Sequence, residues 1–214
     1  IDHFNGLAKY WEVKAGETDG ATGHWVVGPG EDFLSAVKQS LGARPIIAED
    51  LGEAAKEAAV LRKKFDIPGM SILQMAFGEN ANINGNLKSL DSEINVVYTG
   101  THDNDTTIGW FQTLPESVIS TQTAADIVKE RKRALKFLGT DGSEINWDLI
   151  SLALHSKANT VIIPLQDILG LGTNARMNTP GTIEGNWQWR FKNNTLTNDI
   201  IERMRTLTEE SKRL

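Results

Sequence analysis

Short apolar runs alternate with helical patterns along most of the chain. The apolar runs, which predict strands, lie within residues 43–52, 70–77, 94–103 and 159–169. The helical patterns cover residues 31–41, 53–65, 122–138, 146–156 and 197–212. In the first run, Ile46, Ile47 and Ala48 are consecutive, which is typical of a strand buried on both faces. This rhythm predicts an α/β fold in which right-handed crossovers join parallel strands.

Two architectures fit this pattern, a doubly wound sheet and a (β/α)8 barrel. Polar residues collect after at least three predicted strands, which favours the barrel. About four strands are visible, with the end of another at Ile1–Asp2, so closure needs roughly another half. The chain also begins without an initiator Met, as an interior start would. We therefore expect residues 1–214 to be the C-terminal half of a catalytic barrel whose N-terminal half is absent, with a long loop over residues 78–93.

Composition narrows the classes of partner and chemistry. The formal net charge is −6 and no dense basic cluster occurs, which argues against nucleic acid as a partner. The sequence has no cysteine, which excludes thiolate chemistry and disulfides and favours a reducing compartment. No apolar run approaches the ~20 residues that a membrane helix needs, so we expect no membrane association.

Acidic residues follow three of the strand ends. They are Asp2, Glu49, Asp50, Asp103 and Asp105. Because parallel strands deliver their C-terminal ends to one rim of a barrel, we expect these groups to converge. Two carboxyl groups in different environments can differ in pKa, which gives one ionised nucleophile and one proton donor. Retaining glycoside chemistry uses such a pair, with the two groups ~5–5.5 Å apart.

The same acids have structural and metal-binding interpretations. An Asp after a strand is often a helix N-cap or a turn former, and Asp105, just before Thr106, is a candidate cap. The stretch "HDND", residues 102–105, also offers ligands for a hard or borderline cation. No second His lies at ligand spacing, so the sequence favours sugar chemistry over a metal site.

Tryptophans add a second indication of sugar binding. Five of the six lie in or beside predicted loops: Trp11, Trp25, Trp110, Trp187 and Trp189. A flat indole ring there can stack on a sugar face, although packing in a core is the more common role of any one tryptophan.

Several motifs, taken in order, resemble one known family, that of the amylomaltases or disproportionating enzymes, which are 4-α-glucanotransferases. The resemblance runs from the first residue to about Phe191. The motifs are "IDHFNGLAKYWEV", "PIIAEDLG", "PGMSILQMAF", "VVYTGTHDNDTTIGW", "PLQDILGLGTNARMNTPGT" and "GNWQWR".

This resemblance implies a (β/α)8 barrel of the α-amylase superfamily, of which the chain runs from the end of strand four to strand eight. It implies that Asp2 is the nucleophile, Glu49 the general acid/base and Asp103 the transition-state stabiliser. The implied reaction transfers α-1,4-glucan segments, with retention, to the 4-hydroxyl of glucose or another glucan. The implied cofactor is none, because carboxyl groups supply all bond polarisation.

The resemblance also implies the residues and partners that surround this chemistry. His3, His102 and Asn178 match substrate-binding positions of the family. The expected partners are α-1,4-glucans, maltooligosaccharides, glucose and the missing N-terminal half of the same enzyme. The expected location is the cytoplasm, with a plastid as the alternative. Two other functions stay open, a retaining α-glucan hydrolase and a non-catalytic glucan-binding fragment.

Overall fold

The chain forms two compact units, Ile1–Met70 and Ser71–Leu214, in a computed structural model that describes residues 1–52, 54–78, 90–114 and 123–214. Most of the loop predicted at 78–93 lies outside the described residues. Within them, no helix is both long enough and apolar enough to cross a membrane.

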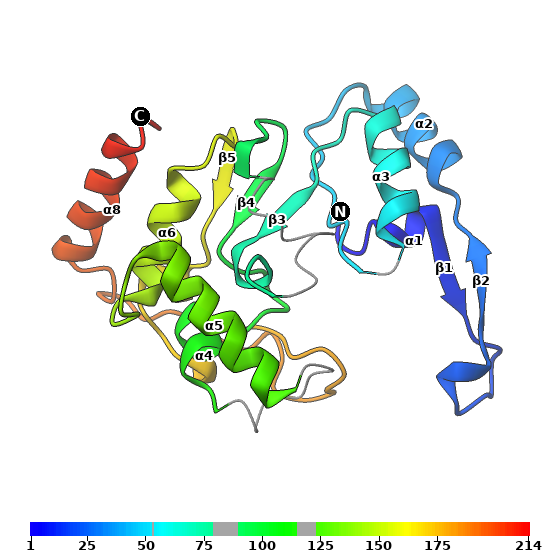
Figure 1. Cartoon of the computed structure of the whole chain (residues 1–214). Coiled ribbons are helices and arrows are strands. Elements are labelled where there is room, and N and C mark those ends of the chain that lie inside the picture. The colour runs from blue at the N-terminus through cyan, green and yellow to red at the C-terminus, as the bar shows by residue number, and fades with distance from the viewer. Residues whose placement is uncertain (53, 79–89, 115–122) are drawn as a thin grey trace. The chain divides into compact units, whose positions relative to one another are not determined.

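The first unit combines short helices with a β-hairpin (Figure 1). Its elements are α1 (Asn5–Ala8), β1 (Lys9–Glu12), η1 (Gly20–Thr22), β2 (His24–Val27), α2 (Gly30–Leu41) and α3 (Ala55–Lys64). The helices predicted at 31–41 and 53–65 are thereby confirmed. Its core contains Phe4, Leu34, Ala48, Ala58, Leu61 and Ile67.

The β-hairpin corrects the placement of two tryptophans. Strands β1 and β2 pair antiparallel, with Trp11 opposite Trp25, so these residues lie on strands rather than in loops. Their ring centroids are 5.4 Å apart in an edge-on arrangement, as expected for a cross-strand aromatic pair.

The strand predicted at 43–52 is wrong as a regular element, because the structure assigns no strand there. The backbone still bonds on both sides: Glu49 N–H donates to the Ile1 carbonyl at 2.9 Å, and Ala48 N–H donates to the Pro68 carbonyl at 2.9 Å. These contacts fix the segment in place without forming the repeated ladder that defines a strand.

The second unit contains the parallel pairing that the sequence predicted. Its sheet has the order β3 (Met70–Ile72), β4 (Val96–Tyr98) and β5 (Thr160–Ile162). Strands β4 and β5 are parallel, with Val97 opposite Val161. Each strand is shorter than the apolar run that predicted it, and after β3 the chain turns into the 3-10 helix η2 (Leu73–Met75).

The second unit also contains several helices and a further 3-10 turn (Figure 1). They are α4 (Thr107–Gln112), α5 (Ala124–Leu138), α6 (Ile145–Leu154), α7 (Leu165–Ile168), η5 (Thr173–Ala175) and α8 (Asn198–Glu210). The helices predicted at 122–138, 146–156 and 197–212 are confirmed, whereas α4 was not predicted. The core contains Leu73, Ala76, Phe77, Leu90, Val97, Ala134, Leu149, Ala153 and Ala158.

Trp110 lies on α4 and not in a loop. Its ring stacks on Phe77 with centroids 6.3 Å apart, and its Nε1–H donates to Glu130 Oε1 at 3.2 Å. Trp110 therefore belongs to the packing of the second unit, which is the more common role of a tryptophan.

Candidate active site

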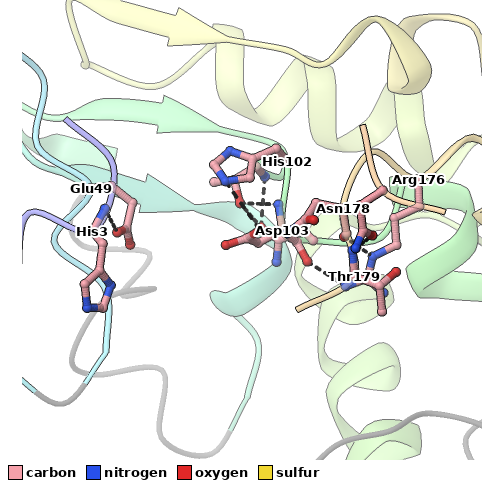
Figure 2. Close-up of polar contacts among 10 residues, drawn as sticks. His3, Glu49, His102, Asp103, Arg176, Asn178 and Thr179 are labelled. Atoms are coloured by element: carbon pink, nitrogen blue, oxygen red, sulfur yellow. Dashed lines mark hydrogen bonds and ion pairs between the residues drawn. The ribbon is translucent and has the colours of Figure 1, made fainter. Parts of the chain in front are cut away.

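The first unit brings Asp2, His3 and Glu49 together by backbone pairing. Glu49 N–H donates to the Ile1 carbonyl, and Phe4 N–H donates to the Glu49 carbonyl, both at 2.9 Å. These two bonds place residues 1–4 beside Glu49. The Glu49 Oε2 atom accepts the His3 N–H at 2.8 Å (Figure 2), and Oε1 accepts the Leu51 N–H at 3.1 Å.

The Glu49 carboxyl group has a pKa raised above its ordinary value. Burial is the main cause, because the half-buried carboxylate loses solvation by water. The N–H groups of Leu51 and His3 act in the opposite direction, and the nearby Asp2 charge raises the pKa further. Glu49 therefore keeps its proton to a higher pH than an exposed glutamate, as a proton donor requires.

Removing the Asp2 charge should lower the pKa of Glu49, because the two carboxylates repel each other. We expect the Asp2→Asn variant to have a Glu49 pKa below that of the wild type, measured by ¹³C NMR titration of the glutamate carboxyl groups. An unchanged or higher pKa of Glu49 in this variant would show that the two groups do not interact.

A buried ion pair supports the segment that carries Glu49. The neighbouring residue Asp50 is 8% exposed, and its Oδ2 lies 2.7 Å from Arg62 Nε on α3. Asp50 Oδ1 also accepts the Met70 N–H at 3.0 Å, and Arg62 Nη1 donates to the Ile67 carbonyl at 2.8 Å. The pair thus ties the Glu49 segment to α3 and to the chain that follows it.

Arg62→Ala should destabilise the first unit by about 3–5 kcal/mol, because it leaves the Asp50 carboxylate buried without its cation. The measurement is the free energy of unfolding from denaturant titration. Lys64, like Arg62, is on α3 and forms an exposed pair with Glu31 of α2. Lys64→Ala is therefore the control and should change the free energy of unfolding by less than about 1 kcal/mol. Equal effects of the two substitutions would contradict this account.

In the second unit, His102 and Asp103 lie in the turn that follows β4. His102 Nε2 is 3.3 Å from Asp103 Oδ1, the same oxygen that accepts Asn178 Nδ2–H at 2.6 Å (Figure 2). Arg176 Nη2 donates to the Asp103 carbonyl at 2.6 Å, and Asn178 N–H donates to the His102 carbonyl at 3.1 Å. Neighbouring side chains therefore fix both the backbone and the carboxylate of Asp103 in position.

The segment containing Arg176 and Asn178 also connects to Trp187. Trp187 N–H donates to the Met177 carbonyl at 2.7 Å, and its ring lies 4.9 Å from the His102 ring between centroids. Its backbone has a φ of 62°, which is strained for a bulky residue and typical of functional segments. Trp187 is exposed and lies outside the helices and strands, so its place in a loop is as predicted, and sugar stacking by its ring stays a prediction.

A cavity of about 190 Å³ opens beside these residues within the second unit. It is lined by Thr101, His102, Asn104, Asp105, Thr106, Pro164, Gln166, Asp167, Arg176, Met177 and Trp187. Among the described residues, no group of three or more His, Cys, Asp or Glu side chains is arranged to hold a metal ion.

The helix cap predicted at Asp105 is wrong by one residue. Thr106 is the N-cap of α4, and its Oγ1 accepts the Gly109 N–H at 3.0 Å. Asp105 instead organises the loop: its Oδ1 accepts the Thr106 N–H at 2.7 Å, and its Oδ2 accepts the Thr173 hydroxyl at 2.8 Å.

Sequence reasoning missed the roles of Arg176 and Asp167. Arg176 stands two residues before Asn178 inside "ARMN", so the motif contained it, but nothing in the sequence shows that it bonds the Asp103 backbone.

Comparison with known proteins identifies the family. Residues 1–197 match the family described as 4-alpha-glucanotransferase, and the chain belongs to it. The chain is 44% identical over 196 residues to the chloroplastic/amyloplastic 4-alpha-glucanotransferase DPE1 of Arabidopsis thaliana, a match covering 91% of this chain and 32% of that protein. It is 43% identical over 219 residues to the 4-alpha-glucanotransferase of Synechocystis, and this match covers 98% of this chain and 39% of that protein. The chain thus spans about a third to two fifths of these relatives.

Solved structures agree with the family. The amylomaltase from Streptococcus agalactiae, solved in complex with acarbose, superposes with a TM-score of 0.83 at 30% identity, covering 99% of this chain and 41% of that one. Amylomaltase from Corynebacterium glutamicum, at 17% identity and a TM-score of 0.70, shares the fold. The prediction of a partial (β/α)8 barrel of the α-amylase superfamily is confirmed.

Proposed function

We propose that this chain is part of a 4-α-glucanotransferase that moves α-1,4-glucan segments between maltooligosaccharides by a retaining double displacement. Family membership of residues 1–197 is the observation that carries the proposal. The site adds chemical support, because a carboxyl group with a raised pKa, Glu49, lies beside a second one, Asp2. That pairing is what retaining glycoside chemistry uses.

The first half-reaction forms a covalent intermediate. The Asp2 carboxylate attacks the anomeric carbon of the donor glucan, and the bond from that carbon to the glycosidic oxygen breaks. Protonated Glu49 gives its proton to the departing oxygen, and its raised pKa supports this role. Asp103, held by Asn178, stabilises the positive charge that develops on the sugar.

The second half-reaction returns the enzyme to its starting state. Glu49, now ionised, takes the proton of the acceptor 4-hydroxyl, and that oxygen attacks the anomeric carbon. The ester bond to Asp2 breaks, and two inversions give net retention. His3 and His102, each next to a catalytic carboxylate in sequence, contact the sugar in this proposal, as does Asn178.

We propose further that residues 1–214 are the C-terminal half of the catalytic barrel and need the other half for activity. Support comes from the share of the relatives that the chain spans, 32% to 39% in the two proteins named above. We assign the protein to the cytoplasm, with a plastid as the alternative, since its relatives come from a cyanobacterium and from chloroplasts.

Incubation of the full-length protein with maltotriose tests the function. Transfer should give glucose together with chains longer than the donor, resolved by chromatography. Shorter sugars without longer ones would show a hydrolase, and no change would refute both enzymatic functions. Residues 1–214 alone should give no products in the same assay, and full activity of this chain would refute the proposal that it is half of the barrel.

A further inference from the structure

We propose that Asp167 is a positioning residue whose single carboxylate holds both ends of the turn that carries His102 and Asp103. We call residues 99–107 the site loop. The geometric part of this inference stands by itself, whereas its consequence for catalysis rests on the proposed function.

The carboxylate of Asp167 bonds the first and last residues of the site loop. Its Oδ2 accepts the Thr99 hydroxyl at 2.5 Å, directly after β4, and its Oδ1 accepts the Thr107 N–H at 2.7 Å, at the start of α4. Asp167 is 1% exposed, and Thr99 and Thr107 are both fully buried. Both contacts are therefore shielded from competing water, which strengthens them.

Asp167 itself stands on a fixed part of the second unit. It lies on α7, which begins three residues after β5 ends, and β5 pairs parallel with β4. The buried Asn146 side chain on α6 donates to the Asp167 carbonyl at 2.8 Å. The carboxylate is thus anchored by a strand and a neighbouring helix, and the site loop is anchored to it.

A carboxylate suits this position because two donors approach it from different parts of the chain. It offers two acceptor oxygens and no hydrogen, whereas an Asn amide offers one acceptor oxygen. Burial raises the pKa of Asp167, and the bonds from Thr107 and Thr99 only partly offset that effect. An acid is thus buried here although desolvation disfavours its charged form. Groups with pKa values shifted in this way are common at functional sites.

Contacts inside the site loop transmit this anchoring to Asp103. Thr101 N–H donates to Asn104 Oδ1 at 2.8 Å, and Asp103 N–H donates to Thr101 Oγ1 at 3.3 Å. The turn is therefore stiff between two held ends. A catalytic group displaced by about 1 Å can lose about 10²-fold in rate, so release of one end should affect turnover.

The test compares Asp167→Ala, Asp167→Asn and Ile127→Ala in the full-length protein. Ile127 is a buried residue of α5 and provides a control for loss of stability. We expect Asp167→Ala to lower kcat for maltotriose about 10²-fold with a smaller change in KM. Asp167→Asn, which keeps one acceptor oxygen, should have a kcat between those of Asp167→Ala and the wild type. Ile127→Ala should have the kcat of the wild type. Wild-type kcat in Asp167→Ala would overturn the catalytic role.

Hydrogen exchange of the same proteins tests the geometry without reference to activity. Amides of the site loop should exchange faster in Asp167→Ala than in Ile127→Ala, and equal exchange would overturn the anchoring. Thr99→Val, which removes one donor and keeps the carboxylate, should shift exchange in the same direction if Asp167→Ala does not fold. A wild type without transfer activity would refute the proposed function, while the exchange comparison would still decide the anchoring role.

Discussion

The Glu49→Gln variant of the full-length protein is expected to disproportionate maltotriose about 10²–10⁴-fold more slowly than the wild type. Gln has the shape of Glu but carries no transferable proton, and it cannot act as a base in the second step. The raised pKa of Glu49 supports the proton-donor role that the substitution removes. The measurement is kcat for the release of glucose from maltotriose.

A donor with a better leaving group separates this role from general damage. α-Glucosyl fluoride needs little protonation to depart, so Glu49→Gln should release a burst of fluoride and then accumulate the glycosyl-enzyme. Glu57→Gln is the matched control, because Glu57 is on the protein surface paired with Lys9. If Glu49→Gln released no burst of fluoride, the acid/base assignment would fail.

The Asp103→Asn variant is expected to lose about 10²–10³-fold in kcat, the range for removing an electrostatic contact made in the transition state. Its effect on KM should be smaller, because the sugar carries little charge in the ground state. The measurement is again the rate of transfer from maltotriose, with kcat and KM determined separately.

Two further variants provide comparisons for the loss of rate in Asp103→Asn. Asn178→Ala removes one hydrogen bond to the Asp103 carboxylate, a contact that typically contributes about 1.5–3 kcal/mol, so its loss of rate should be smaller. Asp141→Asn changes an exposed aspartate that accepts the Ser143 N–H, and it should leave transfer unchanged. A fall in rate for Asp103→Asn no larger than for Asp141→Asn would remove Asp103 from the mechanism.

The fold could be predicted where hydrophobic pattern and local propensity agree. α5 illustrates this, because Thr123 and Asp126 form a capping box at its start and Gly139 takes a left-handed conformation at its end. The segment 43–52 illustrates the reverse. Ile46, Ile47 and Ala48 are partly or fully buried as in a strand, but the hydrogen bonds of the segment go to Ile1 and Pro68, which are distant in sequence.

The sequence likewise predicts some residues of the candidate site and not others. Asp2, Glu49 and Asp103 could be predicted because acids after strand ends and family motifs both indicate them, and their catalytic roles stay a prediction. The residues that hold them could not be found this way. Arg62 and Asp167 act through contacts that only the folded chain creates, and each looks like an ordinary surface residue in the sequence.

Trapping the glycosyl-enzyme tests the central claim most directly. The full-length protein would be treated with 5-fluoro-α-glucosyl fluoride, which slows the second step, then quenched, digested and examined by peptide mass spectrometry. The account predicts one added fluoroglucosyl group on the peptide that contains Asp2, and none on this peptide in Asp2→Asn. A label on any other carboxylate, or transfer from maltotriose with inversion at the anomeric carbon, would contradict it.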